Sequence, residues 1–403
     1  MSLAEVQRFG MDPVRKHVAD YRPASRRTTI FERLEERAPP PAGYNARAMS
    51  DDAISRRKDQ HLDLTLHERV EPEGVTTLLE DVHLVHCSLP ELALDELDLS
   101  VTLCGRRLAA PLVVTGMTGG TARAGAINRD LAAVAERHGL AFGVGSQRIM
   151  ERHPERAASF RVREVAPTVL LLGNIGGRQA AELGADGAEA LMASIGADAL
   201  CVHLNPAQEL IQPGGDRDFR GVAAAIGALA ERLGPRLVVK ETGAGISPAV
   251  GARLASLGVR TVDVSGAGGT SWTRVEALRT VTPQQRALGD AFSGWGLPTG
   301  AALEGLAGSG LALIASGGIR DGLDVAKALA LGATAAGMAL PLLKAHDAGG
   351  VEGADAFVRL ALDGLRTAML LTGSRDVAAL RASRPLVAGR LAEWRRHFEA
   401  GRP

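Results

Sequence analysis

The stretch ALCVHLNPAQELIQPGGDRD, residues 199–218, contains the pattern from which the rest of the chain can be interpreted. Its first four residues are apolar, which is typical of a short buried strand. Four side chains able to bind a phosphate, a metal ion or a proton follow: His203, Asn205, Gln208 and Glu209. Active sites form at the carboxyl ends of strands in parallel α/β sheets, so this stretch predicts a strand that ends in a functional site.

The same pattern recurs from about residue 110. Short apolar runs alternate with Gly-rich or polar turns and with Ala/Leu-rich helical segments. The apolar runs are 111–117, 141–146, 168–176, 199–205, 236–243, 259–269, 311–319 and 333–343. Eight such units predict an α/β fold of the (β/α)8 TIM barrel type, with an open doubly wound sheet as the alternative, because strand number does not prove closure. Residues 271–300 are interpreted as a long connection, of a kind that is usually functional or mobile.

The chain divides into three predicted parts. Residues 1–50 are rich in Arg and Glu and end near three prolines, which predicts an N-terminal extension that is partly disordered or peripheral. Residues 51–385 contain the barrel, with a β-rich lead-in at 78–92, and residues 386–403 form a helical tail.

Composition narrows the class of protein. The 46 basic and 46 acidic residues cancel, which argues against nucleic acid or an anionic membrane as a partner. No apolar run is long enough to span a bilayer, and the first twenty residues lack the apolar core of a signal peptide. The three cysteines are scattered and odd in number, so we expect a reduced, cytoplasmic protein without a disulfide framework.

Two early strand ends carry polar groups. The segment GMTGGT (116–121) offers backbone N–H groups from paired glycines and the hydroxyl of Thr118, although a plain tight turn is an equal alternative. In GSQR (145–148), Arg148 could hold a phosphate with two hydrogen bonds, whereas Ser146 could simply cap a helix. The amide of Asn174 ends the third strand, where a lone Asn is usually a turn former.

Two further strand ends carry charges. Glu209, grouped with the polar residues before it, suits Mg²⁺, which binds one or two carboxylates together with substrate phosphates. Lys240 follows the apolar run of the fifth strand and predicts a Schiff-base nucleophile or a fixed cation, with an ion pair to Glu241 as the structural alternative.

The last two strand ends are predicted to bind phosphate. SGGIRDG (316–322) places Gly317 and Gly318 before a helix that begins near Gly322, and that helix is expected to supply N–H groups and its dipole. Outside the barrel, RRKDQH (56–61) is either a solvated charge run or an arm that folds over the site and holds an anion. Two anion sites in one barrel indicate a phosphorylated cofactor that faces a phosphorylated substrate.

The motifs together resemble one family. RKDQH, MTGGT, GSQR, NIGG, HLNPAQE, VKETGAGIS, DVSGAGGTSW, WGLPTG and GGIRDGLDVAKALALGA, in this order, resemble the type 2 isopentenyl-diphosphate isomerases over roughly residues 53–385. The resemblance implies an FMN-dependent barrel that interconverts isopentenyl and dimethylallyl diphosphate in isoprenoid biosynthesis. It also implies Mg²⁺, reduction of the flavin by NADPH, no net redox change, and a cytoplasmic homo-oligomer, commonly a tetramer or octamer.

The resemblance also implies residue roles. The diphosphate would be bound by Arg57, Lys58, His61, Arg148, His203, Asn205 and Gln208. Gln208 and Lys240 would be catalytic, and Glu209 would bind Mg²⁺. The flavin would contact Gly116, Met117, Thr118, Ser146, Asn174, Lys240, Ser265 and Thr270, and its phosphate Gly317, Gly318, Ala339 and Leu340. A cation such as Lys240 beside the pyrimidine edge would stabilise an anionic reduced flavin.

Several residues depart from the family pattern. Gly214 stands where an acidic residue is expected, Thr242 and Ala244 where larger apolar residues are expected, and Gly173 where Ala is usual. These departures leave open a paralogue that acts on another prenyl diphosphate. Two further alternatives are a redox-active FMN-dependent barrel oxidoreductase, which would need a His/Arg pair for hydride abstraction, and a non-catalytic flavin- or prenyl-phosphate-binding protein.

Overall fold

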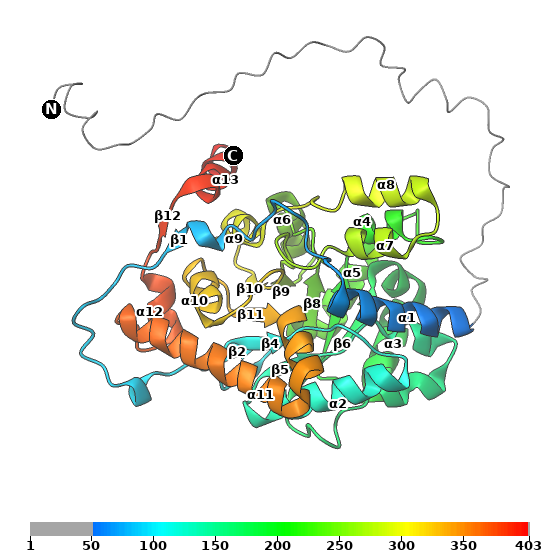
Figure 1. Ribbon diagram of the computed structural model, residues 1–403, viewed down its shortest axis with the longest axis horizontal. Helices are drawn as coiled ribbons and strands as arrows, with labels where there is room; N and C mark the ends of the chain where they lie inside the picture. The colour runs from blue at the N-terminus through cyan, green and yellow to red at the C-terminus, as the bar shows by residue number, and fades with distance from the viewer. Residues whose placement is uncertain (1–50, 402–403) are drawn as a thin grey trace, which may run out of the picture. The chain divides into compact units, whose positions relative to one another are not determined.

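Eight parallel strands close into a barrel in the computed structural model, which describes residues 51–401 (Figure 1). In chain order they are β4 (Leu112–Val114), β5 (Ala141–Gly143), β6 (Leu170–Gly176), β7 (Ala199–His203), β8 (Leu237–Lys240), β9 (Thr261–Asp263), β10 (Ala312–Ala315) and β11 (Ala335–Met338). Each strand lies within one predicted apolar run. The last strand pairs with the first, Ala336 opposite Leu112, so the closed barrel is confirmed and the open sheet is excluded.

Helices cover the outside of the barrel. They are α2 (Ala122–Arg137), α3 (Gly177–Ile195), α4 (Pro206–Ile211), α5 (Val222–Leu233), α6 (Pro248–Ser256), α7 (Trp272–Arg279), α8 (Pro283–Ala291), α9 (Thr299–Leu306), α10 (Gly322–Ala330) and α11 (Leu340–Leu371). Side-chain caps explain several starts: Thr121 accepts from the N–H of Ala124 before α2, and Ser271 accepts from the N–H of Arg274 before α7. Between β5 and β6 the chain forms two 3-10 helices instead, Gln147–Glu151 and Pro154–Ser159.

The interpretation of residues 271–300 as a long connection is wrong. This stretch folds into α7 and α8 and the beginning of α9. Ser271 caps α7 and Pro283 occupies the first turn of α8, where its missing N–H costs nothing. Charged and polar residues in this stretch interrupt the apolar periodicity from which a helix is predicted.

The barrel interior is apolar below the site. Val113, Leu172, Val238 and Ile314 are among the buried side chains that fill it. A hairpin of β2 (Val101–Leu103) and β3 (Arg106–Leu108) contributes two more buried leucines to this cluster, and thereby covers the interior at the end away from the site. The open end is therefore the carboxyl end of the strands, as the sequence pattern predicts.

Helix α1 (Asp51–His67) packs against α7 and α11, which flank the carboxyl end of the barrel (Figure 1). Two contacts tie it to α2: Thr121 donates to Asp59 over 2.9 Å, and Arg123 pairs with Asp63 over 2.5 Å. The predicted extension, residues 1–50, lies outside the described residues.

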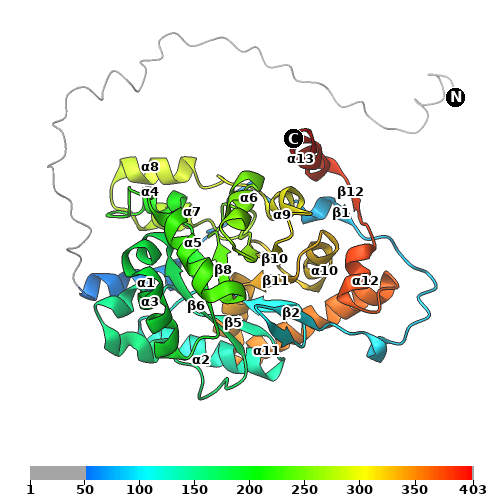
Figure 2. The ribbon, with the colours of Figure 1, turned by 180° about the vertical axis from the view of Figure 1, so that it is seen from behind.

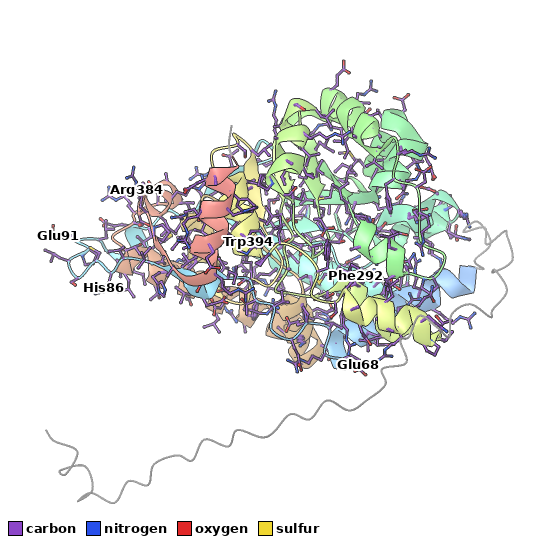
Figure 3. All side chains as sticks on the ribbon, turned by 90° about the horizontal axis from the view of Figure 1, so that it is seen from above. Glu68, His86, Glu91, Phe292, Arg384 and Trp394 are labelled. Carbon is purple, nitrogen blue, oxygen red and sulfur yellow. The ribbon has the colours of Figure 1, made fainter. Side chains whose placement is uncertain are left out.

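The C-terminal tail joins the segment that precedes the barrel. β12 (Leu386–Val387) pairs with β1 (Val82–His83), so the predicted β-rich lead-in is reduced to a two-residue strand after a 3-10 turn at Leu79–Asp81. α12 (Val377–Ala382) precedes β12, and α13 (Gly389–Ala400) follows it (Figure 2). Figure 3 shows His86 and Glu91, from the loop after β1, at the end of the described part far from Phe292, which follows α8.

Candidate active site

A cavity of about 1620 Å³ lies at the carboxyl end of the strands. All of the residues to which the resemblance assigns a role line it, from α1, from the ends of the eight barrel strands and the loops after them, and from α4 and α11. The sequence prediction thus places its candidates in one space. Further residues that line this cavity, Gln212, Arg217, Trp272 and Arg320 among them, were not predicted.

Two cations from α1 are held in the cavity wall. Lys58 donates from Nζ to the carbonyl of Ser146 over 3.0 Å and lies 5.3 Å above the ring of Phe160. Burial, followed by the charge of Arg57, lowers the pKa of Lys58 to about 7. Burial also lowers the pKa of Arg57, whose Nε has no hydrogen-bond partner among the described residues. The interpretation of RRKDQH as a solvated charge run is therefore wrong, and the arm is an ordered helix.

Glu276 of α7 joins the polar groups on this side. Its carboxylate lies 2.9 Å from Nε2 of His61, accepts from Nε2 of Gln208 over 3.3 Å and pairs with Arg279. The amide of Gln212 satisfies both of its neighbours when its nitrogen donates to Glu276 over 3.2 Å and its oxygen accepts from Arg57 over 3.1 Å. Glu276 is fully buried, which raises its pKa, but the hydrogen bond and charge of His61 and the charge of Arg279 outweigh burial and hold the pKa at about 2.

Sequence reasoning missed Glu276. It lies inside the stretch interpreted as a connection, and α7 carries charged residues at positions 274, 276 and 279, a pattern typical of an exposed helix. Only the spatial arrangement shows that this carboxylate faces α1 and α4. The His61 ring also packs edge-on against Trp272, with centroids 5.2 Å apart, so α7 fixes His61 through two contacts.

Glu209 is held in α4 by its neighbours. Its carboxylate accepts from Nδ2 of Asn205 over 3.0 Å and from the backbone N–H of Asp216 over 2.7 Å, and it is 7% exposed. Arg217 donates to the carbonyls of Glu209 and Gly215, which locks the turn that follows α4. The side chain of Asp216 in the same turn lies 3.5 Å from Arg148.

This arrangement offers a metal one carboxylate. No cluster of three His, Cys, Asp or Glu side chains that could hold a metal ion occurs in residues 51–401. Mg²⁺ retains waters and is often bound through one or two carboxylates plus substrate phosphates. Glu209 therefore fits a Mg²⁺ ion that a bound phosphate helps to hold, and does not fit a closed protein site.

His203 and Asn174 form a pair at neighbouring strand ends. Nδ1 of His203 lies 2.8 Å from Oδ1 of Asn174, whose Nδ2 donates to the carbonyl of Val144 over 3.0 Å. Burial, followed by the charges of Lys240 and then Arg148, lowers the pKa of His203 to about 3, so the imidazole is neutral at physiological pH.

Lys240 is buried at the end of β8. Its Nζ donates to the backbone carbonyl of Glu241 over 2.5 Å, while the Glu241 carboxylate accepts from the N–H groups of Thr242 and Ala244. The predicted alternative, a side-chain ion pair between Lys240 and Glu241, is therefore wrong. Burial raises the pKa of Glu241 to about 7, with the hydrogen bonds to Ala244 and Thr242 acting against it. Lys240 thus lines the cavity.

The two glycines after β10 line the cavity and are required there by close packing on their other side. Gly317 and Gly318 have φ angles of 93° and 81°, and a Cβ atom would lie 2.1 Å from the carbonyl oxygen of Gly266 at the first and 2.4 Å from Thr77 at the second. Only glycine fits both positions. The start of α11, Ala339 and Leu340, completes this cradle with the N–H groups of a helix N-terminus.

One predicted part of this cradle is wrong. The helix that begins at Gly322, α10, is capped by Asp321, which accepts from the N–H of Asp324 over 2.9 Å. A Cβ atom at Gly322 would lie 2.1 Å from the carbonyl oxygen of Ala361, so this residue packs against α11 and does not line the cavity. The helix dipole at the cradle is that of α11.

The closed ring of eight parallel strands surrounded by helices places the protein in the (β/α)8 barrel class. Residues 216–386 match the model of the FMN-dependent dehydrogenase family. Mandelate oxidase structures, at 18% identity, superpose on 84% of this chain and 98% of theirs with a TM-score of 0.55, which shows the fold alone.

Closer relatives identify the family. Isopentenyl-diphosphate delta-isomerase of Synechococcus sp. is 48% identical over 82% of this chain and 96% of its own length. The proteins of that name from Stutzerimonas stutzeri and Thermococcus kodakarensis are 46% and 44% identical, each over 84% of this chain, and over 99% and 92% of their own lengths. The chain belongs to the isopentenyl-diphosphate delta-isomerase family and is an enzyme, which confirms the resemblance.

Proposed function

We propose that this enzyme interconverts isopentenyl diphosphate and dimethylallyl diphosphate, with reduced FMN, Mg²⁺ and NADPH. One observation carries the proposal: the Nε atom of Arg57 is buried in the cavity wall without a hydrogen-bond partner among the described residues, beside a second half-buried cation, Lys58. A buried N–H donor without a partner costs about 1–3 kcal/mol, which an anionic ligand restores by accepting its hydrogen bond. The names of the relatives support an isopentenyl diphosphate as that ligand.

The diphosphate is proposed to bind between α1 and the ends of β5 and β7. Arg57, Lys58 and Arg148 supply positive charge, and His61, His203 and Asn205 supply further polar contacts. Helix α1, held on α7 and α11, covers the substrate and excludes water from the reacting carbons. The binding energy of the diphosphate thereby orients the apolar end of the substrate.

The cradle at the other strand ends fits the phosphate of FMN. It consists of Gly317, Gly318, Ala339 and Leu340, which line the cavity and offer backbone N–H donors. The buried Lys240 is placed to stabilise negative charge on a bound reduced flavin, which supplies acid/base chemistry at the substrate double bond. The remaining predicted flavin contacts line the same cavity: Gly116, Met117, Thr118, Ser146, Asn174, Ser265 and Thr270.

Gln208 is the proposed catalytic side chain beside the reacting carbons. Its amide donates to Glu276 and its Oε1 lies 3.3 Å from Nδ2 of Asn205, so both ends of the amide are oriented. Glu209, one residue later on α4, is proposed to hold Mg²⁺ together with the diphosphate. NADPH is proposed only as the reductant of the flavin, since double-bond migration needs no net electron transfer.

The proposal is tested by anaerobic incubation of the enzyme with isopentenyl diphosphate, FMN, NADPH and Mg²⁺, with products measured by NMR. We expect catalytic formation of dimethylallyl diphosphate with only trace consumption of NADPH. Stoichiometric NADPH consumption would instead establish a redox enzyme. Flavin binding without turnover would refute this substrate, and longer prenyl diphosphates in the same assay would then identify a paralogue or, if all fail, a binding protein.

We also propose a cytoplasmic homo-oligomer, a tetramer or octamer. Exposed apolar side chains around α8 support self-association: Val281, Leu288, Phe292 and Trp295. Light scattering after size-exclusion chromatography measures the state, and a monomer would refute this part. Among the described helices, none combines the length and apolar character needed to cross a membrane.

A further inference from the structure

The pairing of Asn174 with His203 fixes which nitrogen of the imidazole carries the proton. Asn174 ends β6, and its Nδ2 donates to the carbonyl of Val144, which can only accept. Turning the amide round would place two oxygens against each other, so Oδ1 must face His203. Oδ1 also only accepts, and Nδ1 of His203 therefore carries the hydrogen.

The other ring nitrogen, Nε2, is consequently bare. No residue among 51–401 donates a hydrogen bond to it, and the neighbouring strand has glycine at position 176, where a Cβ would lie only 3.3 Å from Nε2. His203 lines the cavity beside the cations proposed to bind diphosphate. A bare nitrogen lone pair repels phosphate oxygens, so in this state His203 cannot donate to the ligand.

The charges that act on His203 are all positive. They come from Lys240 on β8, Arg148 after β5 and Lys58 on α1, and no carboxylate among the described residues is hydrogen-bonded to the ring. This field and burial keep the ring neutral in the free enzyme. A bound diphosphate opposes this field, because it adds negative charge to the same space.

We propose that Asn174 is a positioning residue that holds His203 as the neutral Nδ1–H tautomer, so that the enzyme binds diphosphate together with one proton from solvent. The proton adds to Nε2, an N–H bond forms, and Nε2–H then donates to a phosphate oxygen while Nδ1–H remains on Asn174. No other bond changes. This inference rests on the proposed diphosphate substrate.

The test is calorimetric titration of isopentenyl diphosphate into the FMN-loaded enzyme at saturating Mg²⁺, in two buffers of different ionisation enthalpy. The difference in heat gives the number of protons taken up. His203→Gln places an amide nitrogen near the position of Nε2, a donor that needs no added proton. We expect this variant to bind diphosphate with about one proton fewer than the wild type.

Asn174→Asp provides the matched variant. The carboxylate has the same shape and stabilises a doubly protonated ring, so His203 is charged before binding. The variant also loses the hydrogen bond to the carbonyl of Val144, so its thermal unfolding is compared with that of the wild type. We expect about one proton fewer here as well, with binding retained. The nitrogen NMR signals of the His203 ring are identified by their absence from the spectrum of His203→Gln. In the wild type these signals should change from the Nδ1–H tautomer to the doubly protonated form when ligand binds. In Asn174→Asp they should show the doubly protonated form both with and without ligand.

The outcomes separate the two hypotheses. If the wild type binds no isopentenyl diphosphate, the proposed function fails. If it binds and His203→Gln or Asn174→Asp takes up as many protons as the wild type, the proposed function stands and this inference is overturned. An unchanged far-UV circular dichroism spectrum of both variants checks that the barrel is folded.

Discussion

Lys58 should make diphosphate affinity depend on pH, and replacing it should remove that dependence. Its pKa is lowered from 10.5 to about 7 by burial and then by Arg57, a shift equivalent to about 5 kcal/mol in favour of the neutral amine. Below about pH 7 the amine is charged and can bind the diphosphate. Above that pH the free enzyme loses the charge, and the ligand must recover it from solvent.

The magnitude follows from the fraction of charged amine. With a pKa of about 7, roughly 1% of Lys58 is charged near pH 9, so its contribution weakens affinity about 100-fold between pH 6 and pH 9. Lys58→Arg keeps a permanent charge, because a guanidinium is not deprotonated in this range. This variant should lose the Lys58 part of the pH dependence and bind better than the wild type near pH 9.

The assay is calorimetric titration of the FMN-loaded enzyme with isopentenyl diphosphate across this pH range. The ligand's own ionisation and that of His203 affect both proteins, so the difference between the wild type and Lys58→Arg isolates Lys58. Lys58→Met should bind more weakly than the wild type near pH 6 and equally near pH 9. Parallel pH profiles for the wild type and Lys58→Arg would refute the reasoning.

Lys58 also links pH to stability in the free enzyme. Because the folded pKa lies below the unfolded value, the unfolded chain binds the extra proton between about pH 7 and 10.5. The penalty for folding is therefore complete below about pH 7 and disappears as the pH rises through 10.5. Urea unfolding of Lys58→Met should show less gain in stability over this range than the wild type.

Three other substitutions test separate parts of the site. Glu276→Gln leaves His61 and the nearby cations without their buried carboxylate, so it should lower the free energy of unfolding by about 3 kcal/mol in urea titrations. An unchanged free energy of unfolding would mean that the carboxylate charge does not stabilise the fold. Glu209→Gln should abolish Mg²⁺-dependent turnover while FMN remains bound, and full activity would disprove the metal assignment. Gly173→Ala places a Cβ 2.8 Å from Oε1 of Gln147 and should cost about 1–3 kcal/mol by the same titrations, whereas an unchanged midpoint would show that Gln147 moves freely.

The Gly173 contact also gives one departure from the family pattern a physical reason. Gln147 is fully buried, and its amide oxygen accepts from the N–H of Asn174 while its nitrogen donates to the carbonyl of Leu191. These bonds hold the Gln147 side chain against residue 173, where a methyl group would intrude. Gly214 has a φ of 70°, a conformation that suits glycine better than an acidic residue. Nothing in the structure explains Thr242 and Ala244.

The sequence predicted those features of the fold and the site that depend on residues close together in the chain. Apolar runs of the right length located every barrel strand, and polar residues directly after them, such as His203 and Lys240, line the cavity because parallel strands bring their carboxyl ends together. It failed where the outcome depends on contacts distant in sequence. Glu276 is buried because α1 and α4 pack against α7, and the start of α10 is turned toward α11 and not toward the cavity.

The pairing of β1 with β12 has a consequence for how the enzyme forms during its synthesis. Leu391 donates from its backbone N–H to Asp81, a contact that spans 310 residues of chain, and Val82 pairs with Val387. A ribosome must therefore release nearly the whole polypeptide before the segment that leads from α1 into the barrel gains its partner. Closure of such distant contacts is slow, and the unpaired edge of β1 stays exposed until then. Nascent chains that stall before residue 386 should be substrates for chaperones and proteases, because residues 81–83 then lack their partners at 386–391.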